Sequence, residues 1–214
     1  MTYLEIVNNI LRRLREPEVL SITDTEYSKM IGTLVNDAKR EVENSHTWNA
    51  LRTLIPVTTV IGTQQYTMTG SGDRFIFEQC LDTSNGWPID KAPVSWVEQQ
   101  TLVDSSNGVP SYFCFTGVDS SGDTKVKFFK TPATVQTFNF YLYVPQTDLT
   151  TSTDASSVPG YLIAQNAYAR AIAERGEDSG NLSSEAYAMY QKALSDAIAI
   201  ERNRYEEDIN WEAT

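Results

Sequence analysis

The chain changes its hydrophobic periodicity twice, and this pattern limits its architecture. Near the N-terminus the helical pattern LVNDAKREVENSHTWNALR runs directly into the strand pattern LIPVTTV. Near the C-terminus the strand pattern VQTFNFYLYVP gives way to SVPGYLIAQNAYARAIAERG, which is again helical. The helices at each end are amphipathic and need apolar partners, and the obvious partners lie at the other end of the chain. Helices from the two ends therefore have to meet across a β insertion.

We expect an α+β protein in which an N-terminal and a C-terminal helix pair form an antiparallel bundle around an inserted antiparallel β region. With 214 residues the chain is long enough for one core and a small insertion. The predicted divisions are the N-terminal helices 1–53, the β-rich region 54–157, the C-terminal helices 158–201 and a tail 202–214.

Local signals place the helix ends. Thr2 and Glu5 have the spacing of a capping box, and Thr23 and Glu26 repeat it before the second helix. Pro17 is expected to end the first helix, and the second should reach about residue 47. Near the C-terminus, Pro159 is expected at the first position of a helix, and Arg175-Gly176 is a stop signal.

The middle of the chain has the period-2 alternation of strands. The sequence around Asn85-Gly86 predicts a hairpin, and Ser95 with Glu98 predicts a capped helical turn. SYFCFTG, TKVKFFK and VQTFNFYLYV are expected to form a three-stranded meander. Further strands are predicted at Pro56–Val60, Gln65–Met68 and Phe75–Cys80.

Composition and charge narrow the class of partner. The chain is 41% hydrophobic and 21% charged, which is typical of globular proteins, and it has no apolar run of about 20 residues that would span a bilayer. The net charge of −11 disfavours tight binding to a nucleic-acid backbone. The amphipathic N-terminus does not resemble a signal peptide. We therefore expect synthesis in a reducing cytoplasm, with Cys80 and Cys114 as buried thiols rather than a disulfide.

The residues needed for catalysis are sparse. His46 is the only histidine, and its position in the sequence favours a place at the end of a helix or on the surface. No G-x-S-x-G, P-loop or Rossmann motif occurs. Two cysteines and one histidine are too few for a His/Cys zinc set. The acidic run Asp119–Asp123 is explained more simply as a hairpin turn than as a calcium loop. We predict no enzyme activity, no cofactor and no metal.

The order of several segments resembles a known family, the head-to-tail adaptor proteins of tailed bacteriophages, including the tail tubular A-type proteins. The segments that carry the resemblance are AKREVENSHTWNALR, GTQQYTM, GVPSYF, VKFFKTPATVQTFNFYLYVPQTDL, VPGYLIAQNAYARAIAERGE and EAYAMYQKALSDAIAIERNR. The resemblance covers essentially the whole chain, and it lies in their order and spacing.

This resemblance implies a structural virion protein of the neck or tail, made in the host bacterial cytoplasm. Such adaptors form a ring, usually of twelve copies, between the portal protein and the next tail component, a nozzle or a tail terminator. DNA passes through the channel without specific binding, and no membrane is involved. The implied portal contacts are Arg202, Arg204, Tyr205, Ile209 and Trp211. The implied tail contacts lie in loops at Asp119, Ser120, Ser121, Gly122, Asp123 and Leu149.

Other interpretations remain open from the sequence. Tyr205, Ile209 and Trp211 either anchor the chain in a partner or fold back onto its own helices. The insert also fits a receptor- or glycan-binding tail-associated β module, with Trp87, Trp96 and Tyr112 stacking on sugars. A hydrolase that uses two carboxylates is a further alternative, but 28 acidic residues give that hypothesis little specificity.

Overall fold

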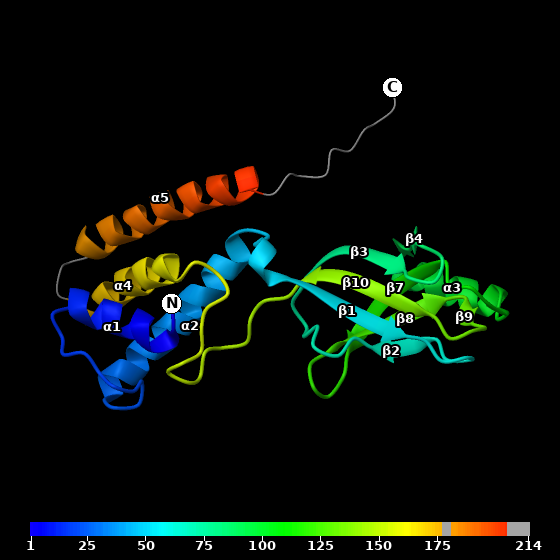
Figure 1. Ribbon diagram of the computed structural model, residues 1–214, viewed down its shortest axis with the longest axis horizontal. Coiled ribbons are helices and arrows are strands. Elements are labelled where there is room, and N and C mark those ends of the chain that lie inside the picture. Colours follow the sequence, from blue (N-terminus) through cyan, green and yellow to red (C-terminus); the bar gives the residue numbers. More distant parts are fainter. Residues whose placement is uncertain (177–180, 205–214) are drawn as a thin grey trace, which may run out of the picture. The chain divides into compact units, whose positions relative to one another are not determined.

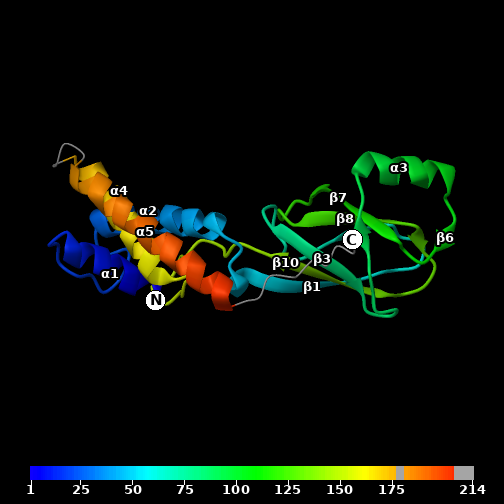
Figure 2. The same ribbon diagram turned by 90° about the horizontal axis from the view of Figure 1, so that it is seen from above.

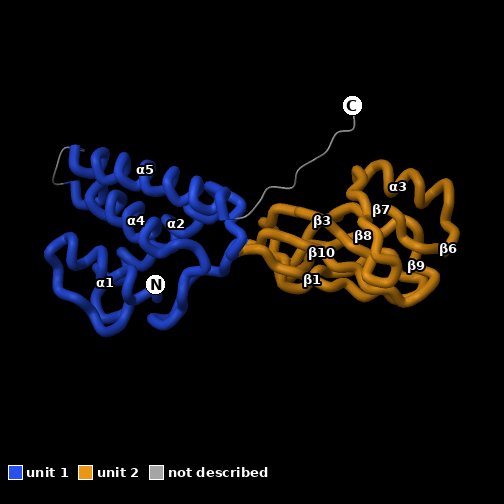
Figure 3. The backbone as a smooth tube through the Cα atoms, turned by 45° about the horizontal axis from the view of Figure 1, so that its top comes forward, with its two compact units in different colours: residues 1–50, 145–214 blue, residues 51–144 orange. Residues whose placement is uncertain are grey.

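The computed structural model describes residues 1–176 and 181–204, and the chain forms two compact units, coloured separately in Figure 3. Unit 1 combines residues 1–50 with 145–214, and unit 2 consists of residues 51–144. Helical segments from both ends of the chain thus share one unit. The return segment 145–157 also groups with the helices, so the insertion ends at residue 144 rather than at 157.

Unit 1 is built around the helix α4 (Gly160–Arg175), which contacts three other helices. These are α1 (Tyr3–Arg13), α2 (Glu26–Ser45) and α5 (Asn181–Arg204), as Figure 1 shows. Because α4 contacts both N-terminal helices as well as α5, the helices are not paired simply by chain end. A fifth helix, α3 (Val94–Val103), lies in unit 2, so the chain is a mixed α+β protein.

The helix caps match the predictions in part. The capping box of α1 is confirmed, because Thr2 N donates to Glu5 Oε2 at 2.8 Å and Glu5 N donates to Thr2 Oγ1 at 3.3 Å. The predicted box of Thr23 and Glu26 is wrong, since Thr25 and Ser28 form the capping box of α2. Ser28 Oγ also donates to Ile22 O at 2.8 Å, a bond that the spacing rule does not take into account.

Proline positions also differ slightly from expectation. The helix α1 ends at Arg13, before Pro17, and the chain then turns through Arg15 at a φ of 60°. Pro159 is the N-cap of α4 rather than its first residue. Gly176 ends α4 as predicted, at a left-handed φ of 65° that glycine adopts without strain.

Unit 2 contains two four-stranded sheets and a short two-stranded one. The first sheet has the order β1 (Arg52–Thr58), β10 (Thr137–Tyr143), β3 (Ile76–Asp82) and β4 (Trp87–Pro88). The second has the order β2 (Gln65–Thr67), β8 (Thr124–Phe129), β7 (Tyr112–Val118) and β5 (Asp90–Lys91). The third pairs β6 (Asn107–Gly108) with β9 (Thr131–Pro132).

The predicted three-stranded meander is wrong, because its last strand belongs to a different sheet. The strands β7 and β8 pair with each other, whereas β10 lies between β1 and β3. The inward residues of β10 meet the other sheet: Phe138 lies 4.6 Å from Phe128 and Phe140 lies 5.1 Å from Phe113, between ring centroids. The pairs β5–β7 and β6–β9 are parallel, so the unit is not wholly antiparallel.

The hairpin at Asn85-Gly86 is confirmed by the antiparallel pairing of β3 with β4. The short helix was placed correctly but its cap was not. The helix α3 begins after Pro93, which offers no side-chain cap, and Ser95 lies inside the helix.

Candidate functional site

The single histidine has a structural role at a helix end. His46 is the C-cap of α2, and its ring packs edge-to-face on Trp48 with centroids 5.4 Å apart. Trp48 is buried and donates from Nε1 to Val42 O at 2.7 Å. These contacts agree with the prediction that His46 lies at a helix end.

Both cysteines are free and buried, as predicted. Cys80 packs in the core between the two larger sheets, where burial raises its pKa to about 12, with a smaller contribution from Asp82. Cys114 lies in a separate cluster with Val97 and Phe129, and its pKa is also raised by burial. Because the thiolate is the reactive form, neither side chain is poised for chemistry.

The loop 119–123 is a closed turn that holds two chain segments together. Asp119 Oδ1 accepts from Ser121 N at 2.8 Å and from Asp123 N at 3.0 Å. Asp123 Oδ1 in turn accepts from Gly72 N at 3.0 Å, and backbone hydrogen bonds from Gly70 and Gly72 lower the pKa of Asp123. Within residues 1–176 and 181–204, no three His, Cys, Asp or Glu side chains gather closely enough to hold a metal ion.

Leu149, one of the predicted tail contacts, is buried in the single chain. Its side chain is 3% exposed and it belongs to unit 1 rather than to the β insert. Asn36 fixes its backbone, donating from Nδ2 to Leu149 O at 3.1 Å and accepting from Leu149 N at 2.9 Å. The return segment is thus part of the helical unit's structure.

The predicted portal contacts divide between described and undescribed residues. Arg202 and Arg204 lie in the last turn of α5 and are exposed. In the same turn, Glu201 Oε1 accepts from Asn49 N at 3.1 Å, which fixes the C-terminal part of α5 within unit 1. Tyr205, Ile209 and Trp211 lie outside the described residues.

The helix α5 has two faces with apolar side chains. The buried face carries Tyr190, Leu194 and Ala197. A second stripe contains Leu182, Met189 and Ile200, which are 57%, 60% and 66% exposed. At 100° per residue the spacings of 7 and 11 residues place these three side chains within about 20° of one another. This second stripe, hereafter the α5 stripe, is exposed to solvent in the single chain.

A polar network joins α2 to both C-terminal helices. Glu41 of α2 accepts hydrogen bonds from Asn166 Nδ2 at 2.9 Å and from Tyr187 OH at 3.3 Å, and it forms an ion pair with Arg170. Burial alone would raise the pKa of Glu41, but the hydrogen bonds from Asn166 and Arg170 outweigh it and lower the pKa. The network fixes the register between helices from opposite ends of the chain.

The same helix carries a buried ion pair that was not predicted from the sequence. Lys39 is fully buried and Glu43 is 4% exposed, and Lys39 Nζ lies 3.2 Å from Glu43 Oε1. Lys39 Nζ also donates to Gln146 O at 2.6 Å and to Thr147 O at 3.1 Å, while Glu43 Oε1 accepts from Gln146 N at 3.2 Å. The available signal was the position of Lys39, four residues after Val35 and three before Val42 on the apolar stripe of α2.

A family model described as SU10 adaptor protein matches residues 1–211, which is nearly the whole chain. The chain belongs to the SU10 adaptor family. Members of this family are adaptor proteins of phage tails, so the chain is a structural component of a phage virion. No curated protein matches the chain.

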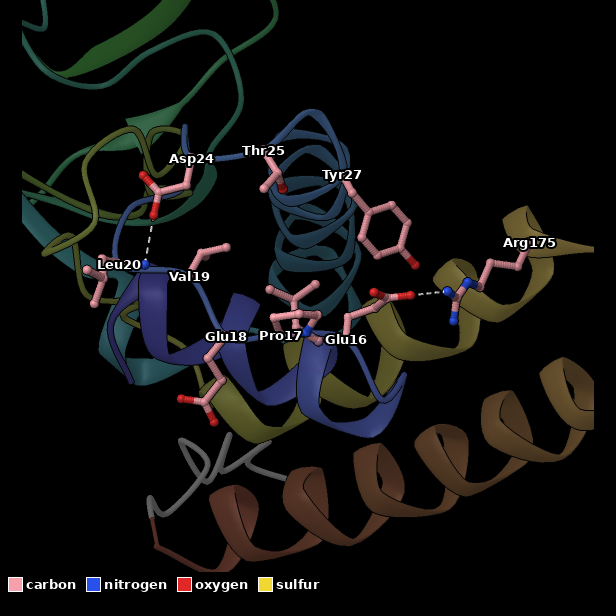
Figure 4. Close-up of a pocket in the computed structure, with 10 residues that line it drawn as sticks. Glu16, Pro17, Glu18, Val19, Leu20, Asp24, Thr25, Tyr27 and Arg175 are labelled. Atoms are coloured by element: carbon pink, nitrogen blue, oxygen red, sulfur yellow. Dashed lines mark hydrogen bonds and ion pairs between the residues drawn. The ribbon is translucent and has the colours of Figure 1, made fainter.

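One hollow of the adaptor lies in unit 1 beside the loop between α1 and α2 (Figure 4). It has a volume of about 430 Å³, and its charged groups are held by internal contacts. Arg175 pairs with Glu16 and donates to Leu14 O at 3.3 Å, and Asp24 accepts from Leu20 N at 2.8 Å. These contacts hold the loop on the end of α4.

The aromatic residues considered for glycan stacking are mostly engaged within unit 2 of the adaptor. Trp96 packs edge-to-face on Tyr112 at 4.9 Å and on Phe129 at 5.6 Å, between ring centroids. Trp87 differs, since it is 70% exposed.

No helix among the described residues has both the length and the apolar character to cross a bilayer.

Proposed function

We propose that the chain is the head-to-tail adaptor of a phage, forming a ring between the portal and the tail and lining the channel through which DNA leaves. Its partners are the portal protein on one side, the next tail component (nozzle or tail terminator) on the other, and its own copies within a ring of about twelve. Membership of the adaptor family supports this role. The net charge of −11 suits a channel wall to which DNA does not adhere, and synthesis takes place in the host cytoplasm.

The observation that carries the proposal is the α5 stripe. This helix is 24 residues long, yet its Leu182, Met189 and Ile200 stay exposed and aligned. Scattered exposed apolar residues need no explanation, but an aligned stripe on a long helix matches the packing of one helix on another. The neighbouring copy in a ring covers such a face, because every copy in a ring presents the same two surfaces.

The end of α5 is the proposed portal-docking element. Arg202 and Arg204 lie there, and residues 205–214 continue the chain with Tyr205, Ile209 and Trp211. Arginine, tyrosine and tryptophan are the residue types that dominate binding energy at protein interfaces. On the β insert, the turn with Asp119, Ser120, Ser121, Gly122 and Asp123 is the proposed tail contact from the sequence.

Electron microscopy of the protein with the portal from the same genome tests the proposal. We expect an additional layer on the portal with the full chain and none after deletion of residues 202–214. A second variant, Met189→Lys with Ile200→Lys, should still bind the portal but fail to reach the ring's copy number in mass photometry. Ile76→Lys, at a site 53% exposed on unit 2, is the matched control and should assemble normally.

Monomers that ignore the portal would overturn the adaptor proposal. Binding of the insert to soluble glycans in an array would then favour the glycan-binding alternative. Normal ring formation by the Met189→Lys, Ile200→Lys variant would instead show that α5 is not the interface between copies.

A further inference from the structure

One end of unit 2 presents aliphatic side chains that the unit itself does not cover. They are Val60, Ile61, Leu102, Val103, Val109 and Val135, with exposed fractions between 54% and 88%. They come from the loop after β1, the end of α3, the loop after β6 and the loop before β10. Figures 1 and 2 show α3, β6 and β9 toward this end of the unit. We call this set of six residues the apolar tip.

The loops that carry the apolar tip are tied to one another by hydrogen bonds. Thr59 N donates to Gln136 O at 2.8 Å and Gln136 N donates to Thr59 Oγ1 at 2.9 Å. Gly62 N donates to Pro132 O at 3.0 Å, and Ala133 N donates to Gly108 O at 3.1 Å. The exposed side chains therefore stand on an ordered backbone, and binding through them costs little conformational entropy.

The apolar tip is also free of charge in a strongly charged chain. Segments 59–65, 105–111 and 131–137 contain no Asp, Glu, Lys or Arg, although 21% of the whole chain is charged. Asp104, which follows the end of α3, is paired with Lys130 at 3.2 Å. Depletion of charged residues distinguishes the core of a protein interface from ordinary surface.

The strand register places the apolar tip at a defined end of unit 2. The strands β1 and β10 pair from Arg52↔Tyr143 at one end to Thr58↔Thr137 at the other. The chain enters and leaves the unit at the first end, whereas the loops of the tip continue from the second. Val118 and the turn at 119–123 extend toward the first end, since Asp123 and Thr124 bond to Gly72, just before β3.

We propose that the apolar tip is the main docking surface of the insert and that its occupant is an uncharged, apolar groove on the next protein of the tail. This proposal rests on the adaptor function and replaces the turn at 119–123 as the principal tail contact. A protein groove fits better than a membrane, because Lys130, the cation beside the tip, is already paired and offers no attraction to anionic lipid. Trp87, exposed at the same end on the β3–β4 hairpin, adds the kind of aromatic side chain that anchors protein interfaces.

The test compares the two ends of unit 2 in the assembled complex. The tip variant is Ile61→Lys with Val135→Lys, and the matched variant at the other end is Ile76→Lys with Val118→Lys, whose sites are 53% and 50% exposed. Each is bound to the portal and titrated with the purified next tail component, with mass photometry as readout. We expect the tip variant to bind the portal normally and the tail component at least tenfold more weakly, while the other variant binds both. Leu102→Ser with Val103→Ser on α3 should also weaken tail binding and provides a second, milder variant.

Several outcomes would overturn the proposal. Equal tail binding by the tip variant would remove the tip as a docking surface, and loss only in the Ile76→Lys, Val118→Lys variant would reassign docking to the end with the turn at 119–123. Loss of rings in the tip variant would make a second copy the occupant, and flotation of the wild type alone with anionic liposomes would make it a lipid surface. These results leave portal binding intact, so they differ from failure of the adaptor function, in which the wild type binds no portal and the tip proposal falls with it.

Discussion

The buried pair of Lys39 and Glu43 gives the sharpest prediction about stability. Lys39→Met keeps the length and volume of the side chain but removes the hydrogen bonds to both carboxylate oxygens of Glu43, to Gln146 O and to Thr147 O. Glu43 then remains 4% exposed without its counter-ion. Removing one partner of a buried ion pair costs about 3–5 kcal/mol. Against a total unfolding free energy of about 5–15 kcal/mol, this is a large fraction.

Urea denaturation measures this loss. Far-UV circular dichroism at 222 nm follows unit 1 in particular, because four of the five α-helices among the described residues lie there. With a urea m-value of about 2 kcal/mol/M, a loss of 4 kcal/mol lowers the midpoint by about 2 M. Lys29→Met is the matched control: its pair with Glu26 is exposed, and removing such a pair costs less than about 1 kcal/mol.

A double variant tests whether the loss of unfolding free energy comes from leaving the Glu43 carboxylate buried without its counter-ion. In Lys39→Met with Glu43→Leu no unpaired charge is left buried at this site, so the loss should be smaller than the sum of the two single losses by at least about 1 kcal/mol. Strict additivity, or a loss below about 1 kcal/mol for Lys39→Met alone, would show that the two charges do not act as a desolvated pair.

Three further predictions concern other contacts in the two units. Gly32→Ala should lower the melting temperature, because a Cβ there would lie 2.5 Å from Tyr3 Oη, an overpacking that costs about 1–3 kcal/mol. Adding Tyr3→Phe to this variant should restore part of the loss. A higher melting temperature for Gly32→Ala alone would contradict this reasoning. Glu41 has a folded pKa below its ordinary 4.5, so its contribution to stability is present above pH 4.5 and is lost as the pH falls through the folded pKa. The unfolding free energy of the wild type should therefore fall more steeply in acid than that of Glu41→Gln, whereas parallel pH profiles would refute the role of the network. Finally, the native protein should show almost no reaction with Ellman's reagent at pH 8 and two reactive thiols in guanidinium chloride, because Cys80 and Cys114 are both buried; rapid modification of the native protein would indicate that the β core opens readily.

Local features of the fold were predictable where the residues involved are close in sequence. The capping box of Thr2 and Glu5, the stop at Gly176 and the hairpin at Asn85-Gly86 each depend on a few neighbouring residues. The alternation of β10 matches its burial, since Phe138, Phe140 and Leu142 share one face and are fully buried. The cap of α2 failed because two overlapping spacings compete, and the additional bond from Ser28 to Ile22 O favours Thr25.

Sheet partners and buried charges could not be predicted in the same way. The period-2 pattern of β10 shows which residues face inward but not which strands lie beside it, and it pairs with β1, about 80 residues away in sequence. Lys39 and Glu43 satisfy the i,i+4 spacing of an exposed helix pair, but in the structure both are buried and bond to the backbone of residues 146–147, which the spacing does not predict. Leu149 is a similar case, because it lies in a polar segment and is buried through contacts with Asn36, more than 100 residues away in sequence.

The pairing of β1 with β10 explains how one helical unit can be built from two distant parts of the chain. Seven consecutive residue pairs, from Arg52↔Tyr143 to Thr58↔Thr137, hold the two strands together, and Val144 N donates to Leu51 O at 3.0 Å where they join unit 1. The pairing of β1 with β10 therefore brings the end of α2 and the start of the return segment 145–157 close together. Folding of unit 2 thus offsets the loop-closure entropy that would otherwise oppose packing of α4 and α5 on α1 and α2. Lys39 and Glu43 then hold residues 146–147 on α2, just after the chain leaves β10 and returns to unit 1. The buried ion pair and the pairing of β1 with β10 thus both position α4 and α5 on the N-terminal helices in a single register. The binding of any partner along α5 depends on that register.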